Sequence, residues 1–393
     1  MTRFTPVVDR ISYGGAMIGQ EEKDAINAVI NSQGGRRWTI GPESEAFERE
    51  LAEVTGVKHA VVLNSGSSAL LVALAALKLP KGSDVIIPAL NFPTAFNAIL
   101  QNGYTPVVVD IDKETLNISL EQVEELIKRD YAIKAVVAVN IASNPVDLIR
   151  LRKIVGPSVK IVLDNCDGYG TLISNKFVDT LADVSCVSFH AAHIITMGEG
   201  GAILTSNEDI YSAASKMREW GRASGTDKIY EYPGFPDDYR ERYVYEEIGY
   251  NMKPLELQCA MGRIQLKKLS EFRRKRIKNY ERLMEEFEGV SAFETVKVKA
   301  DYATVCWFSF PFICRGVKRK LVMETLEKNN IECRTIFSGN ILLHPAYKDV
   351  DCKRPFDPYP HATDIMHNGV FISVHPSITE KMIEFIGDLI WKF

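Results

Sequence analysis

The chain has 393 residues, of which 46% are hydrophobic and 25% are charged. This length favours one large domain with a smaller companion, and the composition excludes a largely disordered or fibrous protein. With 47 basic and 51 acidic residues the formal net charge is −4, which argues against a nucleic-acid-binding surface and against a polybasic membrane anchor.

The start of the chain, MTRFTPVVDR, lacks the apolar run of a signal peptide, and no stretch of 18 apolar residues suggests a membrane span. The seven cysteines include no C-x-x-C pair and have mostly apolar neighbours. We therefore expect reduced core cysteines rather than a disulfide framework or a metal site, in a cytoplasmic enzyme.

Short apolar runs alternate with helical patterns from about residue 45 to 210. Apolar strands separated by helices predict a mostly parallel sheet covered on both faces, so the expected fold class is α/β. A helix is expected over 67–79, after the first strand. The expected strands are 57–64, 83–90, 132–140, 159–165, 184–189 and 202–206.

The pattern changes after residue 250, where an amphipathic helix over 257–287 precedes a strand over 307–313 and further helix–strand alternation. We therefore predict an N-terminal segment and large domain over 1–250, and a smaller C-terminal α/β domain over 251–393.

Two further features adjoin this boundary. The segment from Ala223 to Tyr245 is rich in Tyr, Pro, Asp and Gly, which predicts a long irregular loop with a functional role. The basic clusters Lys267-Lys268 and Arg273 to Arg276 fall within the expected helix, and we expect them on a solvated face.

Ligands of parallel α/β sheets bind at the carboxyl ends of the strands, and two sites there are informative. Asn64 to Ser68 lies between a strand and a helix, where backbone N–H groups and the helix dipole favour a phosphate, although an ordinary serine N-cap would look the same. Asp164 directly follows an apolar strand, and a poorly hydrated carboxylate needs a cationic partner such as a protonated pyridine nitrogen. A strand-end aspartate that merely caps a loop is the alternative.

A third segment, Ser188 to Gly201, carries two histidines and a glycine-rich turn between two expected strands. This arrangement indicates an active-site loop. An ordinary hairpin with two partly buried histidines is the alternative.

Taken together, these segments resemble the DegT/DnrJ/EryC1/StrS sugar aminotransferase family over nearly the whole chain. The resemblance implies the fold type I of pyridoxal-phosphate enzymes, as in aspartate aminotransferase, with pyridoxal or pyridoxamine 5'-phosphate as cofactor. The motifs that carry it are, in order, Thr39-Ile40-Gly41-Pro42 with Phe47-Glu48, NSGSSAL, PALNFPT, LDNCDG, SFHAAHIITMGEGG, GYNMK and HPAY.

The resemblance also implies roles for individual residues. The backbone of Gly66 and Ser67 and the hydroxyl of Ser188 would hold the cofactor phosphate. Phe92 would stack on the pyridine ring, and Asp164 would pair with its nitrogen.

Two further residues follow from the same resemblance. Asp167 stands where most relatives have Gln or His, so its role is open. Asn251 would reach the cofactor phosphate of the neighbouring subunit, which implies a homodimer with shared active sites.

His193 is the main departure from the family pattern. Relatives place a lysine five residues after the serine of the S-F motif and bind the cofactor through its amine, which an imidazole cannot do. Lys176, the nearest lysine in sequence, lies in a polar turn. The same exchange marks a branch of the family that removes the C3 hydroxyl of nucleotide-linked 4-keto-6-deoxy sugars. There His193, with an ordinary pKa near ~6.5, would take a proton and help the hydroxyl depart.

One subgroup of this branch acts on CDP sugars and carries the cysteines of a 2Fe–2S centre shortly after a W-G-R motif. Here Trp220-Gly221-Arg222 is followed by no cysteine before Cys259, and four thiolates are needed, so no iron–sulfur cluster is expected. The chain is more similar to the iron-free subgroup that acts on GDP-4-keto-6-deoxy-D-mannose. L-glutamate would be the amino donor, and a 3,6-dideoxy-4-keto sugar for surface polysaccharide the product.

Three alternatives stay open at this point. The chain could be an iron-free relative of the CDP-4-keto-6-deoxy-D-glucose 3-dehydratases, a nucleotide-sugar aminotransferase with a displaced lysine, or a non-catalytic cofactor-binding protein. Arg222, Arg334 and His344 are candidates for substrate contacts, although each is more often a surface residue.

Overall fold

The computed structural model describes residues 5, 9–33, 38–129 and 131–393. The N-terminal stretch MTRFTPVVDR, used above to judge targeting, lies largely outside them. No helix in the described part of the chain is both long and apolar enough to cross a membrane.

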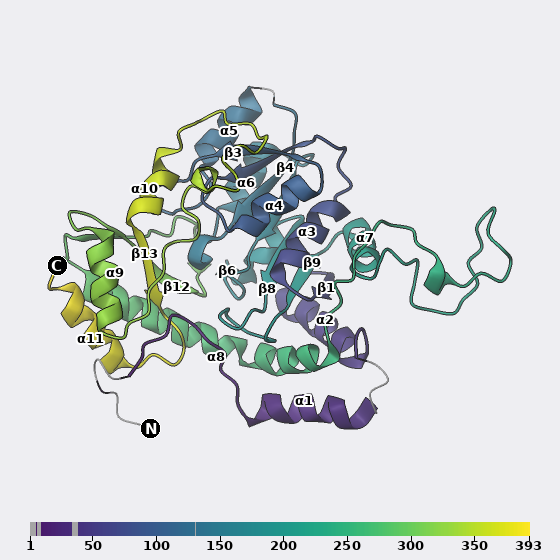
Figure 1. Cartoon of the computed structure of the whole chain (residues 1–393), viewed down its shortest axis with the longest axis horizontal. Helices are drawn as coiled ribbons and strands as arrows, with labels where there is room; N and C mark the ends of the chain where they lie inside the picture. Colours follow the sequence, from purple (N-terminus) through teal and green to yellow (C-terminus); the bar gives the residue numbers. More distant parts are fainter. Residues whose placement is uncertain (1–4, 6–8, 34–37, 130) are drawn as a thin grey trace.

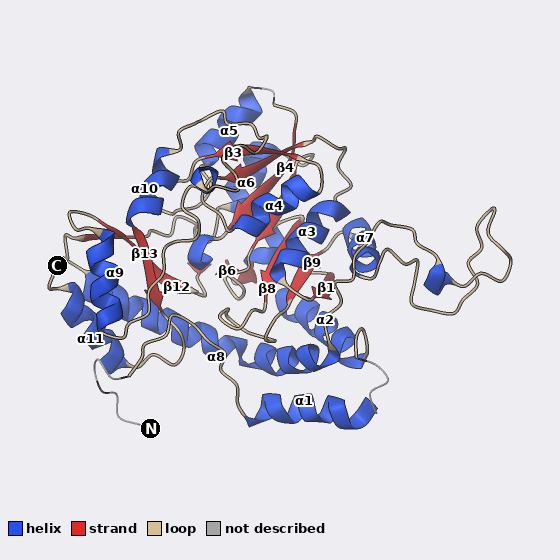
Figure 2. Ribbon diagram, viewed as in Figure 1, coloured by secondary structure: helices blue, strands red, loops and turns tan. Residues whose placement is uncertain are grey.

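A seven-stranded sheet forms the centre of the molecule (Figure 2). Its strands are β1 (His59–Leu63), β2 (Asp84–Pro88), β3 (Thr105–Val109), β4 (Ile133–Val139), β5 (Lys160–Asp164), β8 (Val184–Ser188) and β9 (Gly201–Thr205). Their order is β1-β9-β8-β5-β4-β2-β3. Only β9 runs antiparallel to its neighbours, so the predicted mostly parallel sheet is confirmed.

The six strands expected from the sequence are present, with ends that differ by no more than two residues, whereas β3 was not among them. Its short run TPVVV contains Pro106, which lacks the N–H needed for a central ladder. The proline is tolerated because β3 is the edge strand of the sheet.

Helices cover both faces of the sheet, as its apolar strands require. Alternate residues of β4 point to opposite faces, so Val137 joins one apolar cluster and Val136 the other. The first cluster includes α3 (Gly66–Ala76), α4 (Pro93–Gln101) and α7 (Glu208–Arg218), and the second includes α5 (Leu120–Lys128) and α6 (Leu148–Val155).

The C-terminal part is built on a three-stranded antiparallel sheet in the order β10-β12-β13, with its own apolar cluster around Leu283, Phe310 and Ile386. Ile11 bridges Ile331, which ties the N-terminal segment to this part. The domain boundary at residue 250 stays a prediction. The elements here are α8 (Glu256–Phe287), β10 (Phe293–Thr295), β12 (Ser309–Cys314), α9 (Arg319–Lys328), α10 (Pro360–Asn368), β13 (Gly369–Ser373) and α11 (Glu380–Ile390).

Helix α8 crosses the lower part of the view, above α1 (Gln20–Gln33), and packs against α1 and α2 (Pro42–Thr55) (Figure 1). The carboxylate of Glu256 accepts the backbone N–H groups of Gly41, Glu43 and Ser44 and so caps α2. Gly41 is required because a Cβ there would lie 2.8 Å from the Glu256 carboxylate. A small sheet joins β6 (Leu172–Ile173), β7 (Lys176–Phe177) and β11 (Ala303–Thr304).

Between α7 and α8 the chain leaves the body as a long projecting loop, seen at the right of Figure 1. We call residues 223–248 the arm. Its regular structure is limited to one short 3-10 turn, isolated bridges such as Ile229 to Arg240, and tight turns, which confirms the predicted irregular loop. Its exposed apolar side chains include Tyr232, Tyr243, Tyr245 and Ile248.

The prediction that the basic run in α8 forms a solvated face is wrong for one residue. Arg274 is exposed, but Arg276 is only 1% exposed. Arg276 stands four residues from both Phe272 and Tyr280, so it falls on the apolar face of the helix.

Candidate active site

The candidate site lies where three strands end on the same edge of the central sheet. β5 and β8 are parallel and end at Asp164 and Ser188. β1 runs in the same direction, because both β1 and β8 are antiparallel to β9, and the chain enters α3 just after it. The sheet therefore gathers the strand-end residues selected from the sequence.

The N-terminus of α3 forms a cradle against the end of β8. Ser65 caps the helix by accepting the N–H of Ser68 at 3.0 Å, whereas the N–H groups of Gly66 and Ser67, which open the helix, have no acceptor within it. A Cβ on Gly66 would lie 2.7 Å from Cβ of Ser188, so only glycine allows this approach. Ser67 is exposed beside it. Free N–H groups, a helix dipole and the Ser188 hydroxyl fit a phosphate group.

Two buried carboxyl groups follow β5. Asp164 accepts the backbone N–H of Cys166 at 3.2 Å, and burial raises its pKa. Asp167 is 7% exposed, and its Oδ2 has no hydrogen-bond partner among the described residues. Burial, followed by the charge of Asp164, raises the pKa of Asp167 to about 8. This pocket would gain from a cationic ligand group.

His193 lies beside these carboxyl groups, in the loop after β8. Its Nε2 is 3.7 Å from Oδ1 of Asp167, and its side chain is 17% exposed. Its ring meets that of Phe308 edge to face, with centroids 5.5 Å apart. Burial lowers the pKa of His193 to about 3, and the neighbouring His190 adds to this effect. The imidazole is therefore uncharged at neutral pH and can accept a proton.

Phe92 and His344 lie outside this cluster, on two segments that contact each other through Phe337 and Ser338. The ring of Phe92 is 51% exposed and contacts Phe337 with centroids 6.0 Å apart. His344 Nε2 lies 2.7 Å from the carbonyl oxygen of Ser338, whose hydroxyl donates to the carbonyl of Asn91. His344 thus braces the loop against which Phe92 lies.

Arg334 lies in the C-terminal part, with its guanidinium 4.7 Å from the ring centroid of Tyr13. Tyr13 contacts Phe371, which contacts Phe308 beside His193. Arg334 is thereby linked to the His193 loop through a row of aromatic rings. The described contacts do not join it directly to the buried carboxyl groups.

Arg222 and Asn251 gather instead around the exposed ring of Trp220 at the base of the arm. Arg222 lies 4.4 Å and Lys253 3.2 Å from that ring centroid. Asn251 is exposed, and its Oδ1 accepts a hydrogen bond from Lys253 at 2.6 Å. No described contact joins this group to the residues around His193 in the same chain.

The structure thus brings Gly66, Ser188, Asp164, Asp167 and His193 together and leaves the other candidates on surrounding surfaces. It also adds a residue that the sequence analysis missed, the buried Arg276. Its position in the apolar stripe of α8 was a signal that could have revealed it. Among the described residues, no group of three or more His, Cys, Asp or Glu could hold a metal ion.

Comparisons with known proteins give a consistent result. A model described as the DegT/DnrJ/EryC1/StrS aminotransferase family matches residues 17–390. The GDP-4-keto-6-deoxy-D-mannose 3-dehydratase of Escherichia coli O55:H7 is 33% identical over 387 residues, which cover 94% of this chain and 96% of that protein. The lipopolysaccharide biosynthesis protein RfbH of Salmonella typhimurium is 31% identical over 394 residues, which cover 95% and 89%.

A solved structure of GDP-4-keto-6-deoxymannose-3-dehydratase, with a trapped PLP-glutamate geminal diamine, superimposes with a TM-score of 0.89 at 30% identity. The match covers 97% of this chain and 100% of that one. The expected aminotransferase-like fold is thereby confirmed.

Proposed function

Because this chain belongs to the DegT/DnrJ/EryC1/StrS aminotransferase family, we propose that it is a pyridoxal-phosphate-dependent 3-dehydratase of a nucleotide-linked 4-keto-6-deoxyhexose. GDP-4-keto-6-deoxy-D-mannose is the proposed substrate, because that sugar nucleotide names the similar Escherichia coli enzyme. The observation that carries the proposal is His193, a buried uncharged base in the loop where relatives have a lysine.

The residues present fit the cofactor. The cradle of Gly66, Ser67 and Ser188 would hold its phosphate, and the exposed ring of Phe92 is free to stack on its ring. The buried carboxylate of Asp164 has a single backbone N–H donor and would pair with the pyridine nitrogen. When bound, the cofactor supplies an electron-withdrawing ring that stabilises negative charge on adjacent carbon atoms.

The chain's own contribution to the reaction is proton transfer. Nε2 of His193 is the available base, and Asp167, 3.7 Å away, stabilises the imidazolium when its carboxyl group is ionised. The protonated Nε2 can then give its proton to the departing C3 hydroxyl group. A positioned base of this kind contributes about 10²-fold to 10⁴-fold to a rate.

A displaced lysine is a poor alternative base. Lys176 lies in β7, where it pairs with Ile173, and its side chain is exposed. β6 and β7 belong to the small separate sheet rather than to the strand ends that carry the site. This placement favours a dehydratase over an aminotransferase.

We propose L-glutamate as the amino donor, because the similar solved enzyme was trapped with PLP-glutamate. Supply of a 3,6-dideoxy-4-keto sugar for surface polysaccharide is proposed from the likeness to the Salmonella lipopolysaccharide biosynthesis protein.

The proposed homodimer rests on the arm and on Asn251. The arm projects from the body and exposes aromatic side chains, and Asn251 at its base is exposed and makes no described contact with His193, Asp164 or Asp167 of its own chain. A second copy would cover these aromatic residues and receive Asn251 beside its cofactor phosphate.

Mixing Asn251→Ala with His193→Asn chains should then restore activity, because one site in each hybrid dimer is intact. No recovery after verified subunit exchange would argue against a shared site.

The test of the reaction is incubation of the cofactor-loaded protein with glutamate and a panel of nucleotide 4-keto-6-deoxy sugars, followed by mass spectrometry. Loss of the C3 oxygen, with formation of 2-oxoglutarate and ammonia, is the expected result. Replacement of the ketone oxygen by an amino group would identify an aminotransferase. No turnover of glutamate would identify a non-catalytic protein, and a requirement for iron and an electron donor would favour the CDP-sugar subgroup.

A further inference from the structure

Arg276 is a buried cation without a carboxylate partner. It is 1% exposed in the middle of α8, and no ion pair in the described part of the chain includes it. Its Nη1 donates to the carbonyl oxygens of Trp307 at 3.1 Å and Phe308 at 3.0 Å. Burying an ion is costly unless other charges compensate it, so this residue calls for an explanation beyond packing.

Arg276 and His193 line the same small cavity. Its volume is about 10 Å³, at the lower limit for one water molecule, and Gln265 and His375 are among the other lining residues. A nucleotide sugar cannot enter such a space. Arg276 can therefore influence the reaction only through the residues that it faces.

Phe308 connects Arg276 mechanically to the proposed base. Its carbonyl accepts from Arg276, while its N–H donates to Oγ of Ser143 at 2.8 Å. Oγ of Ser143 in turn donates to the carbonyl of Asp167 at 2.6 Å. The ring of Phe308 meets the imidazole of His193 edge to face. Arg276 thus fixes the segment just before β12, which supports His193 on one side.

Four ionisable groups surround His193. His190 lies in the same loop, Asp167 follows β5, Arg276 comes from α8, and His375 follows β13 across the cavity. Burial and Arg276 lower the pKa of His375 to about 4, and burial raises that of Asp167 to about 8. Arg276, whose pKa burial lowers to about 10, is charged throughout the neutral range. It supplies the fixed positive charge near the base.

We infer that Arg276 is a positioning residue whose buried guanidinium disfavours a second positive charge on His193 and so keeps the imidazole ready to accept a proton. The same repulsion makes the protonated imidazole a stronger acid, which favours delivery of the proton to the departing hydroxyl group. The role in catalysis rests on the proposed function. The electrostatic relation between the two side chains does not, so it can be tested without cofactor or substrate.

The experiment follows the ring signals of His193 by NMR in the cofactor-free protein with carbon-13-labelled histidine, assigned by their loss in His193→Asn. In the wild type, where the pKa of His193 is about 3, we expect the ring to begin to protonate only at the acid end of the range in which the protein is folded. In Arg276→Met and Arg276→Gln we expect the titration midpoint to rise by at least about one pH unit. Arg276→Lys, which keeps the charge, should retain the wild-type behaviour.

Arg274→Met is the matched control, because Arg274 is exposed on the same helix and should leave His193 unchanged. Arg276→Gln removes the charge but can still donate a hydrogen bond to the carbonyl groups of Trp307 and Phe308. If Arg276→Met is unstable, the Gln variant therefore separates the effect of the charge from that of the hydrogen bonds. A second readout is the pH profile of deoxygenation. Its acid limb should move up by about one unit, with kcat affected more than KM.

An unchanged His193 titration in folded Arg276→Met and Arg276→Gln proteins would overturn the inference, whatever reaction the enzyme catalyses. A shifted titration together with full activity of His193→Asn would instead retain the electrostatic relation and reject the proposed function.

Discussion

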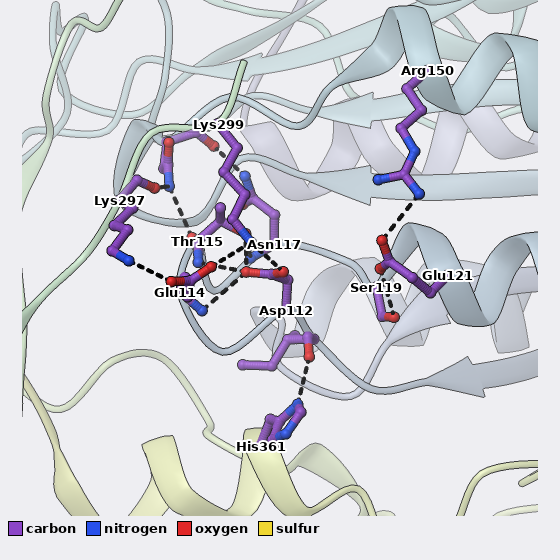
Figure 3. A network of polar contacts seen from close by, with 12 residues as sticks. Asp112, Glu114, Thr115, Asn117, Ser119, Glu121, Arg150, Lys297, Lys299 and His361 are labelled. Atoms are coloured by element: carbon purple, nitrogen blue, oxygen red, sulfur yellow. Dashed lines mark hydrogen bonds and ion pairs between the residues drawn. The ribbon is translucent and has the colours of Figure 1, made fainter. Parts of the chain in front are cut away.

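Two pairs of acidic residues in the central part of the molecule differ in how their charge is balanced. Asp112 and Glu114 lie on the turn after β3, where Lys299 contacts both carboxylates at 2.8 Å and 2.7 Å and Lys297 pairs with Glu114 (Figure 3). These lysine contacts lower the pKa of Glu114 to about 2. The pKa of Asp112 is also lowered, because the Lys299 and backbone hydrogen bonds outweigh the effect of burial.

Asp164 and Asp167 show the opposite behaviour, because no lysine or arginine forms an ion pair with either in the described chain. Burial raises the pKa of both carboxyl groups. The first pair is complete within the fold and serves to join the turn to residues 297–299. The second needs a cation from outside, which is the electrostatic signature of a binding site.

The largest effect is expected at His193, the proposed base, which lies beside Asp167. His193→Asn keeps a polar side chain but removes the base, so C3 deoxygenation should fall by roughly 10²-fold or more. Binding of the sugar nucleotide should change little. Rapid-quench kinetics with preloaded pyridoxamine phosphate would separate the two quantities, and full activity of this variant would rule out the proposed role of His193.

Matched substitutions compare the two pairs directly. Asp164→Asn removes the proposed charged partner of the pyridine nitrogen, so cofactor affinity should fall roughly 10-fold to 100-fold, the usual range for a hydrogen bond to a charged group. Asp112→Asn should leave cofactor affinity unchanged. Spectrophotometric titration of both variants would check this, and equal losses of affinity would remove the distinction between the pairs.

The pH dependence of stability should also distinguish the pairs. The folded pKa of Asp167, about 8, exceeds that of an unfolded aspartate, about 3.9. Its contribution to stability is therefore complete at low pH and is lost progressively from about pH 4 until the pH passes about 8.

We expect the thermal midpoint of cofactor-free wild type to fall by a few degrees over this range relative to Asp167→Asn. Glu114 has the opposite sign, because its folded pKa of about 2 lies below the unfolded value, so its contribution is lost only as the pH drops below about 4. Calorimetry of wild type and Asp167→Asn from pH 5 to pH 8 checks the prediction for Asp167. If the thermal midpoints of the two proteins changed in parallel with pH, the prediction would be contradicted.

The smallest effect is expected at Asp112 and Glu114, whose charges are balanced by lysines of the same chain. Lys297→Met breaks an exposed ion pair with Glu114, and water and salt screen such pairs so strongly that they contribute little to stability. Chemical denaturation should show this small loss of stability, and the apparent affinity for cofactor and the deoxygenation rate should not change. A large loss of activity would show that this turn also takes part in the site.

Much of the site could be identified from the sequence because each of its residues is marked by its immediate sequence neighbours. Asp164 and Ser188 end apolar strands, Gly66 opens a helix directly after a strand, and His193 follows Ser188 at a fixed spacing. The ends of parallel strands must meet at one edge of a sheet, so local patterns sufficed to bring these residues together.

The tertiary structure decided the properties that depend on contacts between distant segments. It showed that the basic run of α8 is interrupted by the buried Arg276, and that Arg222 and Asn251 gather at the base of the arm. A helix pattern marks which residues share a face, but which element packs against that face is set by the whole fold. For this reason the sequence determined the identity of the proposed base, whereas only the packing of α8 against β12 placed a fixed charge behind it.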